Sequence, residues 1–136
     1  MGFVYDKDII GYINIFENIS DVKVKDCYKS DDSLVFIINP KYMSKAIGKN
    51  GSNVKKASRL LRKSIKVIEY DPDVLKFIKN IIHPIYGKIY KESEGIVAIK
   101  LDASKDKGIV IGRDKKNLNK MQKIVSIYFN VKVKVI

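Results

Sequence analysis

Two glycines and a lysine stand together in Gly48-Lys49-Asn50-Gly51, a segment that falls between two predicted helices and is called here the first corner. Glycine tolerates positive φ angles, and because it has no Cβ another backbone can approach it closely. The helix that follows begins with unpaired N–H groups and the positive end of its dipole. A phosphate can lie against that end, where Lys49 adds charge. The segment therefore favours a phosphate contact, although a plain connection between two helices uses glycine in the same way.

Covalent and metal chemistry have few candidate residues in this chain. Cys27 is the single cysteine and His83 the single histidine, so neither an intramolecular disulfide nor a zinc-ligand set can be assembled. The run GKNGS resembles a nucleotide-binding loop, but its lysine precedes the second glycine and the P-loop spacing is not met. We therefore expect no enzyme, no catalytic residue, no metal, no cofactor and no small-molecule substrate.

The charge of the chain favours a polyanionic partner. Lysine and arginine number 27 against 15 acidic residues, a formal net charge of +12. Residues 1–70 carry 13 bases and 8 acids, and residues 71–136 carry 14 and 7, so both halves are basic. This distribution fits a partner such as a nucleic acid better than a basic tail would, although any soluble protein from a lysine-rich proteome is also basic. Apolar runs are far shorter than the roughly 20 residues that span a bilayer, and no leader is visible, so we expect a cytoplasmic protein without membrane contact.

The elements that must position the first corner can be predicted from periodicity and turn residues. Ile9, Ile13 and Phe16 share one face of a helix, and the helix after the corner should bury Val54, Ala57 and either Leu60 or Leu61. The predicted order is a helix over 7–18, a strand over 22–28, an acidic turn over 30–33, a strand over 34–39 ended by Pro40, a short helix over 41–47, a helix over 52–63 and a closing strand over 65–70.

The second half repeats this order after Asp71-Pro72-Asp73, which predicts a helix start with an N-cap and a proline in the first turn. A helix striped by Val74, Phe77, Ile78 and Ile81 should end at His83-Pro84. The predicted order then continues with a strand over 85–91, a turn over 92–95, a strand over 96–101, a short helix to about 111, a long helix to about 129 and a strand over 131–136.

The two halves also match residue by residue. A shift of 64 positions places Ile47-Gly48-Lys49 on Ile111-Gly112-Arg113 and Asn53-Val54 on Asn117-Leu118. An Ile-Gly-basic corner, an asparagine and a helix stripe that coincide at one offset indicate an internal duplication. The segment Gly112-Arg113-Asp114-Lys115 is therefore the second corner.

The stretch AIGKNGSNVKKA at residues 46–57 resembles the signature of the KH fold, and the surrounding order resembles its type II form. The resemblance implies an α+β protein of two tandem type II KH domains, 1–71 and 72–136. Each domain would have the order α-β-β-α-α-β, with a three-stranded sheet packed against helices. KH domains clamp the backbone of about four unpaired nucleotides at the Gly-x-x-Gly loop, with the bases over an apolar groove.

Carried over by position, the resemblance assigns RNA-binding roles to individual residues. Gly48, Lys49, Asn50 and Gly51 would hold phosphates, and Ser52 and Asn53 would present the start of the next helix. Auxiliary backbone contacts would come from Lys45, Lys55 and Lys56, and the groove floor from Ile37, Ile47 and Val54.

The second corner departs from the family pattern. Gly112 and Arg113 are in place, but Lys115 replaces the second glycine and Asp114 sets a carboxylate where a phosphate would lie. We expect the missing glycine to restrict the turn. Gly112, Arg113, Lys115 and Lys116 are therefore weaker candidates for RNA binding, and this copy could serve mainly to support the fold.

Two adjoining domains of this kind resemble the archaeal NusA-like transcription termination and antitermination factors. The resemblance includes residues 8–27, the IGKNGSNVKKA segment, residues 77–85 and the IGRDKKNL segment. It implies a single-stranded RNA partner and, by kinship alone, RNA polymerase. The alternatives are a KH protein of ribosome assembly or RNA processing, and an adaptor that binds proteins through a degenerate KH domain.

Overall fold

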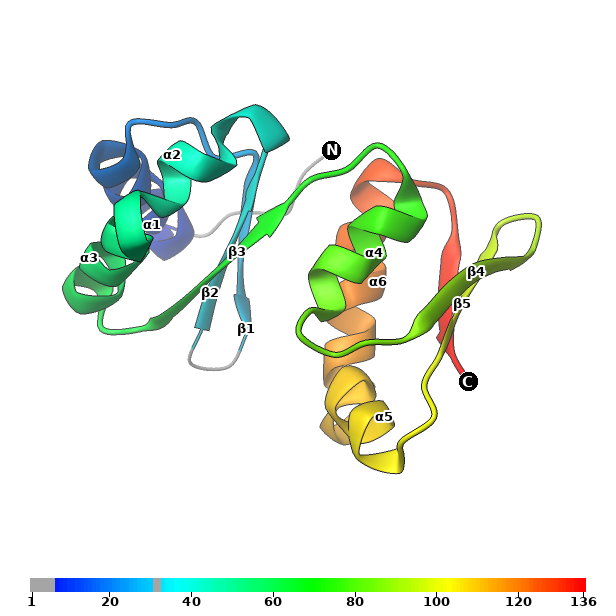
Figure 1. Cartoon of the computed structure of the whole chain (residues 1–136). Helices are drawn as coiled ribbons and strands as arrows, with labels where there is room; N and C mark the ends of the chain where they lie inside the picture. Colours follow the sequence, from blue (N-terminus) through cyan, green and yellow to red (C-terminus); the bar gives the residue numbers. More distant parts are fainter. Residues whose placement is uncertain (1–6, 31–32) are drawn as a thin grey trace. The chain divides into compact units, whose positions relative to one another are not determined.

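The computed structural model describes residues 7–30 and 33–136, which form two compact units that divide between Tyr70 and Asp71. Each unit has one three-stranded sheet, and Figure 1 shows helices covering one face of it. The α+β class and the two successive α-β-β-α-α-β orders expected of type II KH domains are confirmed. Among the described helices, none combines the length and hydrophobicity that a bilayer crossing requires.

Unit 1 has β2 at the centre of its sheet, with β1 antiparallel to it on one side and β3 parallel to it on the other. Its elements are α1 (Lys7–Ser20), β1 (Asp26–Ser30), β2 (Ser33–Ile38), a 3₁₀ turn over Pro40–Tyr42, α2 (Met43–Ile47), a 3₁₀ turn over Lys49–Gly51, α3 (Ser52–Leu61) and β3 (Ser64–Glu69).

The core of unit 1 lies between α1, α3 and the sheet. Phe16 of α1 stacks on Phe36 of β2 with ring centroids 4.4 Å apart, and both side chains are fully buried. Leu34 and Ile38 point to the same face as Phe36 because side chains alternate along a strand. Ala57 of α3 is buried in the same cluster, so its small side chain lets the helix that follows the first corner pack closely.

Unit 2 repeats the sheet, with β5 between antiparallel β4 and parallel β6. Phe77 of α4 lies at its core and contacts Tyr128 edge-on, with the ring centroids 5.8 Å apart. The elements are α4 (Val74–Ile82), β4 (Lys88–Ser93), β5 (Ile96–Lys100), α5 (Ser104–Ile111), a 3₁₀ turn over Arg113–Lys115, α6 (Lys116–Tyr128) and β6 (Lys132–Val135).

Several predicted boundaries are wrong by a few residues. The first strand begins at Asp26 rather than at residue 22, because Val24 N–H donates to the Glu17 carboxylate (2.8 Å) instead of to a neighbouring strand. Residues 31 and 32 of the predicted acidic turn lie outside the described residues. The helix after the first corner ends at Leu61, since Arg62 adopts a left-handed φ of 54°. Leu61 packs on the core, whereas Leu60 is exposed.

Two corrections apply to unit 2. The N-cap of α4 is Asp73, whose carboxylate accepts from Leu75 N–H at 2.9 Å, and not Asp71. The strand predicted over 85–91 begins at Lys88 and runs to Ser93, so the turn is shorter than predicted. The predicted stripe of Val74, Phe77, Ile78 and Ile81 is buried as expected.

Candidate functional site

The first corner turns the chain sharply between α2 and α3. Gly48 has φ 79° and ψ 169°, Asn50 has φ 56°, and Gly51 has φ 73°. Three of the four residues thus have positive φ, and the N–H of Gly51 donates to the carbonyl of Gly48 at 3.1 Å. The turn places Lys49 and Asn50 on the surface directly before the positive end of the α3 dipole.

The two glycines of the first corner have different roles. A Cβ added to Gly48 would lie 2.7 Å from Ser52 Oγ and 3.0 Å from the backbone nitrogen of Asn53, so a side chain there would collide with the start of α3. A Cβ on Gly51 would meet only Lys55 Cε, at 3.9 Å. Gly48 is therefore required by close packing, and Gly51 is favoured only by its left-handed conformation.

Asn53 closes the corner from the α3 side. Its Nδ2 donates to the backbone carbonyl of Lys45 at 2.8 Å, which satisfies one of the carbonyls left open at the end of α2. The Asn53 side chain thus holds α2 and α3 together. Its expected role of presenting the start of α3 to RNA stays a prediction.

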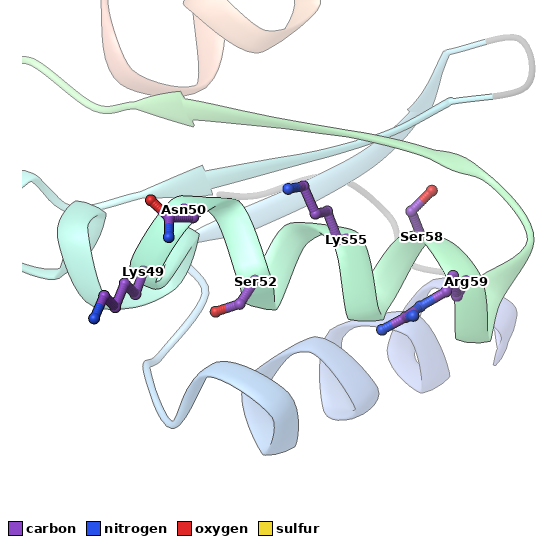
Figure 2. Close-up of a pocket in the computed structure, with 6 residues that line it drawn as sticks. All are labelled: Lys49, Asn50, Ser52, Lys55, Ser58 and Arg59. Atoms are coloured by element: carbon purple, nitrogen blue, oxygen red, sulfur yellow. The ribbon is translucent and has the colours of Figure 1, made fainter.

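Six residues from the first corner and α3 line an open hollow of about 570 Å³. Figure 2 shows Lys49 and Asn50 on the corner, and the other side chains along α3. The sequence pattern singled out Lys49, Asn50, Ser52 and Lys55, but missed Ser58 and Arg59, which also line the hollow. Because Ser52, Lys55 and Arg59 follow the spacing i, i+3, i+7, helical periodicity could have revealed Arg59. The complete lining is Lys49, Asn50, Ser52, Lys55, Ser58 and Arg59.

The other residues predicted for this site lie outside the hollow. Lys45 forms a 3.1 Å ion pair with Asp21, and both side chains are largely exposed. Lys56 is exposed on α3. Among the apolar candidates, Ile47 is 36% exposed and Val54 is half-buried, but Ile37 is 0% exposed and has no surface to offer a base.

The second corner follows nearly the same backbone path as the first. Gly112 has φ 74° and ψ 169°, Asp114 has φ 55°, and Lys115 has φ 61°. Asn117 Nδ2 donates to the Ile109 carbonyl at 2.9 Å, as Asn53 does to Lys45. The expected restriction of the turn is therefore absent, since Lys115 adopts the left-handed conformation that Gly51 has in the first corner. Non-glycine residues pay about 1–2 kcal/mol for this conformation.

The side chains around the second corner carry mixed charges. Arg113, Asp114, Lys115 and Lys116 are all exposed. A Cβ on Gly112 would lie 2.8 Å from the Asn117 side chain, so this glycine has the same packing role as Gly48. The shape of the first corner is thus retained, but a carboxylate stands at its tip.

The single cysteine, Cys27, is buried and neutral. Burial, with a smaller contribution from the Asp26 charge, raises the pKa of the Cys27 thiol to about 12, so it stays protonated at neutral pH. A protonated, buried thiol is a poor nucleophile and a poor metal ligand. Within residues 7–30 and 33–136, no group of three or more His, Cys, Asp or Glu side chains could hold a metal ion.

Comparison with known proteins finds several similar sequences. The family model of the NusA-like second KH domain matches residues 17–73, which lie mostly in unit 1. A probable transcription termination protein NusA of Methanocaldococcus jannaschii is 35% identical over 128 residues, covering 91% of this chain and 70% of that protein. The protein of the same name from Halobacterium salinarum is 30% identical over 121 residues, covering 88% and 87%.

A solved structure is also similar over almost the whole chain. The crystal structure of APE1850 shares 29% sequence identity and superposes with a TM-score of 0.69, covering 97% of this chain and 100% of that one. The overall fold of the chain is therefore similar to that of an experimental structure.

Proposed function

The chain belongs to the NusA-like family of KH-domain transcription factors, and from this premise we propose that it binds single-stranded RNA by clamping the RNA backbone at its first corner. Its relatives are named as probable transcription termination proteins, so the bound RNA would be a transcript during elongation, termination or antitermination. RNA polymerase is proposed as a partner on kinship alone. The family assignment agrees with the expectation that the chain is not an enzyme.

The observation that carries this proposal is that the first corner and α3 line one continuous hollow. Gly48 brings the turn close to α3, and Lys49 and Lys55 supply charge beside the positive end of the helix dipole. A phosphate at the corner would be followed by the next nucleotides along Ser58 and Arg59, where the guanidinium can bind phosphate or stack on a base. Arg59 is therefore added to the proposed contacts.

Auxiliary contacts are proposed for Lys45 and Lys56, which flank the corner and are exposed. Lys45 would exchange its ion pair with Asp21 for a phosphate. An exposed ion pair of this kind contributes at most about 1 kcal/mol, so its loss would cost little of the free energy of RNA binding. Ile47 and Val54 remain the proposed apolar surface for a base.

The second corner is proposed as a weaker contact. Its turn has the right shape, but Asp114 repels a phosphate at the tip and the Lys115 side chain occupies space that Gly51 leaves open. Gly112, Arg113, Lys115 and Lys116 would then add length and charge to the RNA path rather than most of its affinity.

The test is the double variant Lys49→Asp/Asn50→Asp, titrated with labelled single-stranded RNA of about ten nucleotides. Removing a cation and adding two carboxylates should weaken binding by roughly tenfold or more, and parent binding should weaken as salt rises. The variant should fold, because both positions are exposed and Asp114 already occupies the equivalent of Asn50 with nearly the same φ.

The matched control is Asn130→Asp/Lys132→Asp, which makes the same charge change at exposed positions that belong to neither corner. It should cost much less affinity, as should Arg113→Asp. If the corner variant binds RNA as tightly as the parent, the first corner is not the site. An absence of salt-sensitive RNA binding in the parent would instead favour a protein adaptor.

A further inference from the structure

A second hollow lies in unit 2, between α4 and the segment 83–89, and its lining includes no residue of either corner. Its volume is about 260 Å³, below the roughly 300 Å³ at which pockets for drug-sized ligands begin. We call it the α4 pocket. Its lining consists of Leu75, Lys76, Lys79, Ile82, His83, Pro84, Ile85, Tyr86, Gly87 and Ile89.

The walls of the α4 pocket are mainly aliphatic. Leu75 and Ile82 come from α4, and Ile85 and Ile89 come from the segment that follows it. The opposite side of α4 is held in the core by its buried stripe, so the helix is a fixed wall. An aliphatic surface of this kind is suited to an apolar side chain, because it offers dispersion contacts and burial away from water.

Tyr86 projects from the pocket edge and is 84% exposed. At the neighbouring Gly87, a Cβ would lie 2.5 Å from Leu101 Cδ2 and 3.1 Å from the Lys100 carbonyl. The chain therefore runs tightly against the end of β5, and the bulky neighbour Tyr86 stays on the surface. Exposed tyrosines beside a concave apolar surface are typical anchors of protein–protein interfaces.

Positive charge borders the α4 pocket on the helix side. Lys76 and Lys79 are exposed and lie one turn apart, so they share a face of α4, and His83 follows near the helix end. No acidic residue belongs to the lining. The charge complementarity is therefore with a negatively charged occupant.

From these features we propose that the α4 pocket docks an acidic segment of a partner protein, which inserts one apolar side chain beside Tyr86 while its carboxylates pair with Lys76 and Lys79. A nucleobase is the competing occupant, because Lys76, Lys79, His83 and Tyr86 can hydrogen-bond a base edge or stack on a base. The mainly aliphatic walls favour an apolar side chain instead. The proposal does not depend on RNA binding at the corners.

The test uses the full chain labelled with ¹⁵N and a short synthetic peptide with a central Leu-Phe pair between runs of Asp and Glu. Amide signals of residues 75–89 should shift on titration. Lys76→Glu/Lys79→Glu and Tyr86→Ala should each weaken binding by roughly tenfold or more. These side chains are exposed, so both variants should fold.

Two controls separate the contributions. Lys105→Glu/Lys132→Glu makes the same charge change at exposed positions outside the pocket and should leave peptide affinity nearly unchanged. A peptide with Ala-Ala in place of Leu-Phe should bind much more weakly. If both double lysine variants lose the same peptide affinity, the effect comes from the net charge of the protein and not from the pocket, and the proposal is overturned.

Three further outcomes would also overturn it: no peptide-induced shifts at residues 75–89, shifts there caused by oligouridylate in preference to the peptide, or shifts that depend on protein concentration alone. The second outcome would identify the pocket as a nucleic-acid contact. The third would identify a second copy of the chain as its occupant.

Discussion

Gly48 and Gly51 stand at the two ends of one turn, but the structure requires them for different reasons. Gly48 leaves no room for a Cβ because Ser52 and Asn53 lie against it. At Gly51 there is room, and Lys115 shows that a side chain can adopt the equivalent conformation. In the Gly-x-x-Gly motif of this chain, the first position therefore accepts only glycine, whereas the second also accepts a residue with a side chain.

Substitution of these glycines by alanine should separate the two requirements. Gly48→Ala combines a left-handed φ with a collision and should lower the free energy of unfolding by about 2–4 kcal/mol. Gly51→Ala has the conformational cost alone and should lose about 1 kcal/mol. Urea denaturation followed by circular dichroism measures both. Gly112→Ala should behave like Gly48→Ala, and equal losses at positions 48 and 51 would contradict this account.

At the scale of elements, each corner is a joint between two helices that an asparagine locks. Asn53 and Asn117 each reach back eight residues to a carbonyl of the preceding helix. This bond and the close packing at the first glycine occur in both units, whereas the residues at the second, third and fourth positions differ. The joint is thus defined by its first glycine and its asparagine.

The strain in the second joint can be relieved by one substitution. Lys115→Gly removes a left-handed lysine, at the cost of a more flexible unfolded chain, and should raise the free energy of unfolding by about 0.5–1 kcal/mol. The reverse change Gly51→Lys should lower it by a similar amount. Thermal unfolding of the two variants against the parent is the measurement, and a loss of stability in Lys115→Gly would argue against strain at this position.

The bounds of a strand were predicted correctly where the residues with buried side chains are also the residues whose backbones pair. They were misplaced where side chains are buried but the backbone does not pair with a neighbouring strand. Val22 and Val24 alternate with exposed lysines as strand residues do, and both are buried. The strand nevertheless begins at Asp26, because the Val24 N–H before it donates to the Glu17 side chain. Periodicity reports which side chains face the core, and it does not report which backbone groups pair.

The candidate site was predictable in part for a similar reason. The first corner and Lys55 follow from local sequence, since glycine, charge and helix position act within a few residues. Ser58 and Arg59 line the hollow because α3 continues along it. Ile37 cannot contact a base, because its side chain is buried in the sheet. These outcomes depend on tertiary packing, which a four-residue motif does not contain.

At the scale of the molecule, each unit has a core of its own residues. The buried cluster around Phe16 and Phe36 comes from unit 1 alone, and in unit 2 Phe77 of α4 packs against Tyr128 of α6. Both units are basic. Each unit thus has the composition and the core of a small independent domain.

Residues 1–70 and 71–136, produced separately, should therefore each fold. Cores of domains below about 70–80 residues rarely supply more than about 3–5 kcal/mol, so each unit should melt cooperatively but with modest stability. Dispersed amide signals and a sigmoidal thermal transition are the expected observations. A unit without cooperative melting would show that its core depends on the other.

The matching shape of the two corners has a kinetic consequence. Lys49 gives the first corner a formal charge of +1, and Arg113 and Lys115 less Asp114 give the second corner the same value. A phosphate that approaches to within the screening length, about 8 Å at physiological ionic strength, but is not yet in contact is therefore attracted to a similar degree by the net charge of either corner. At contact the Asp114 carboxylate acts on the phosphate separately from the two cations and repels it. The two corners should thus bind an RNA strand with similar association rates. The difference in their affinities should lie in the dissociation rate, which should be faster at the second corner.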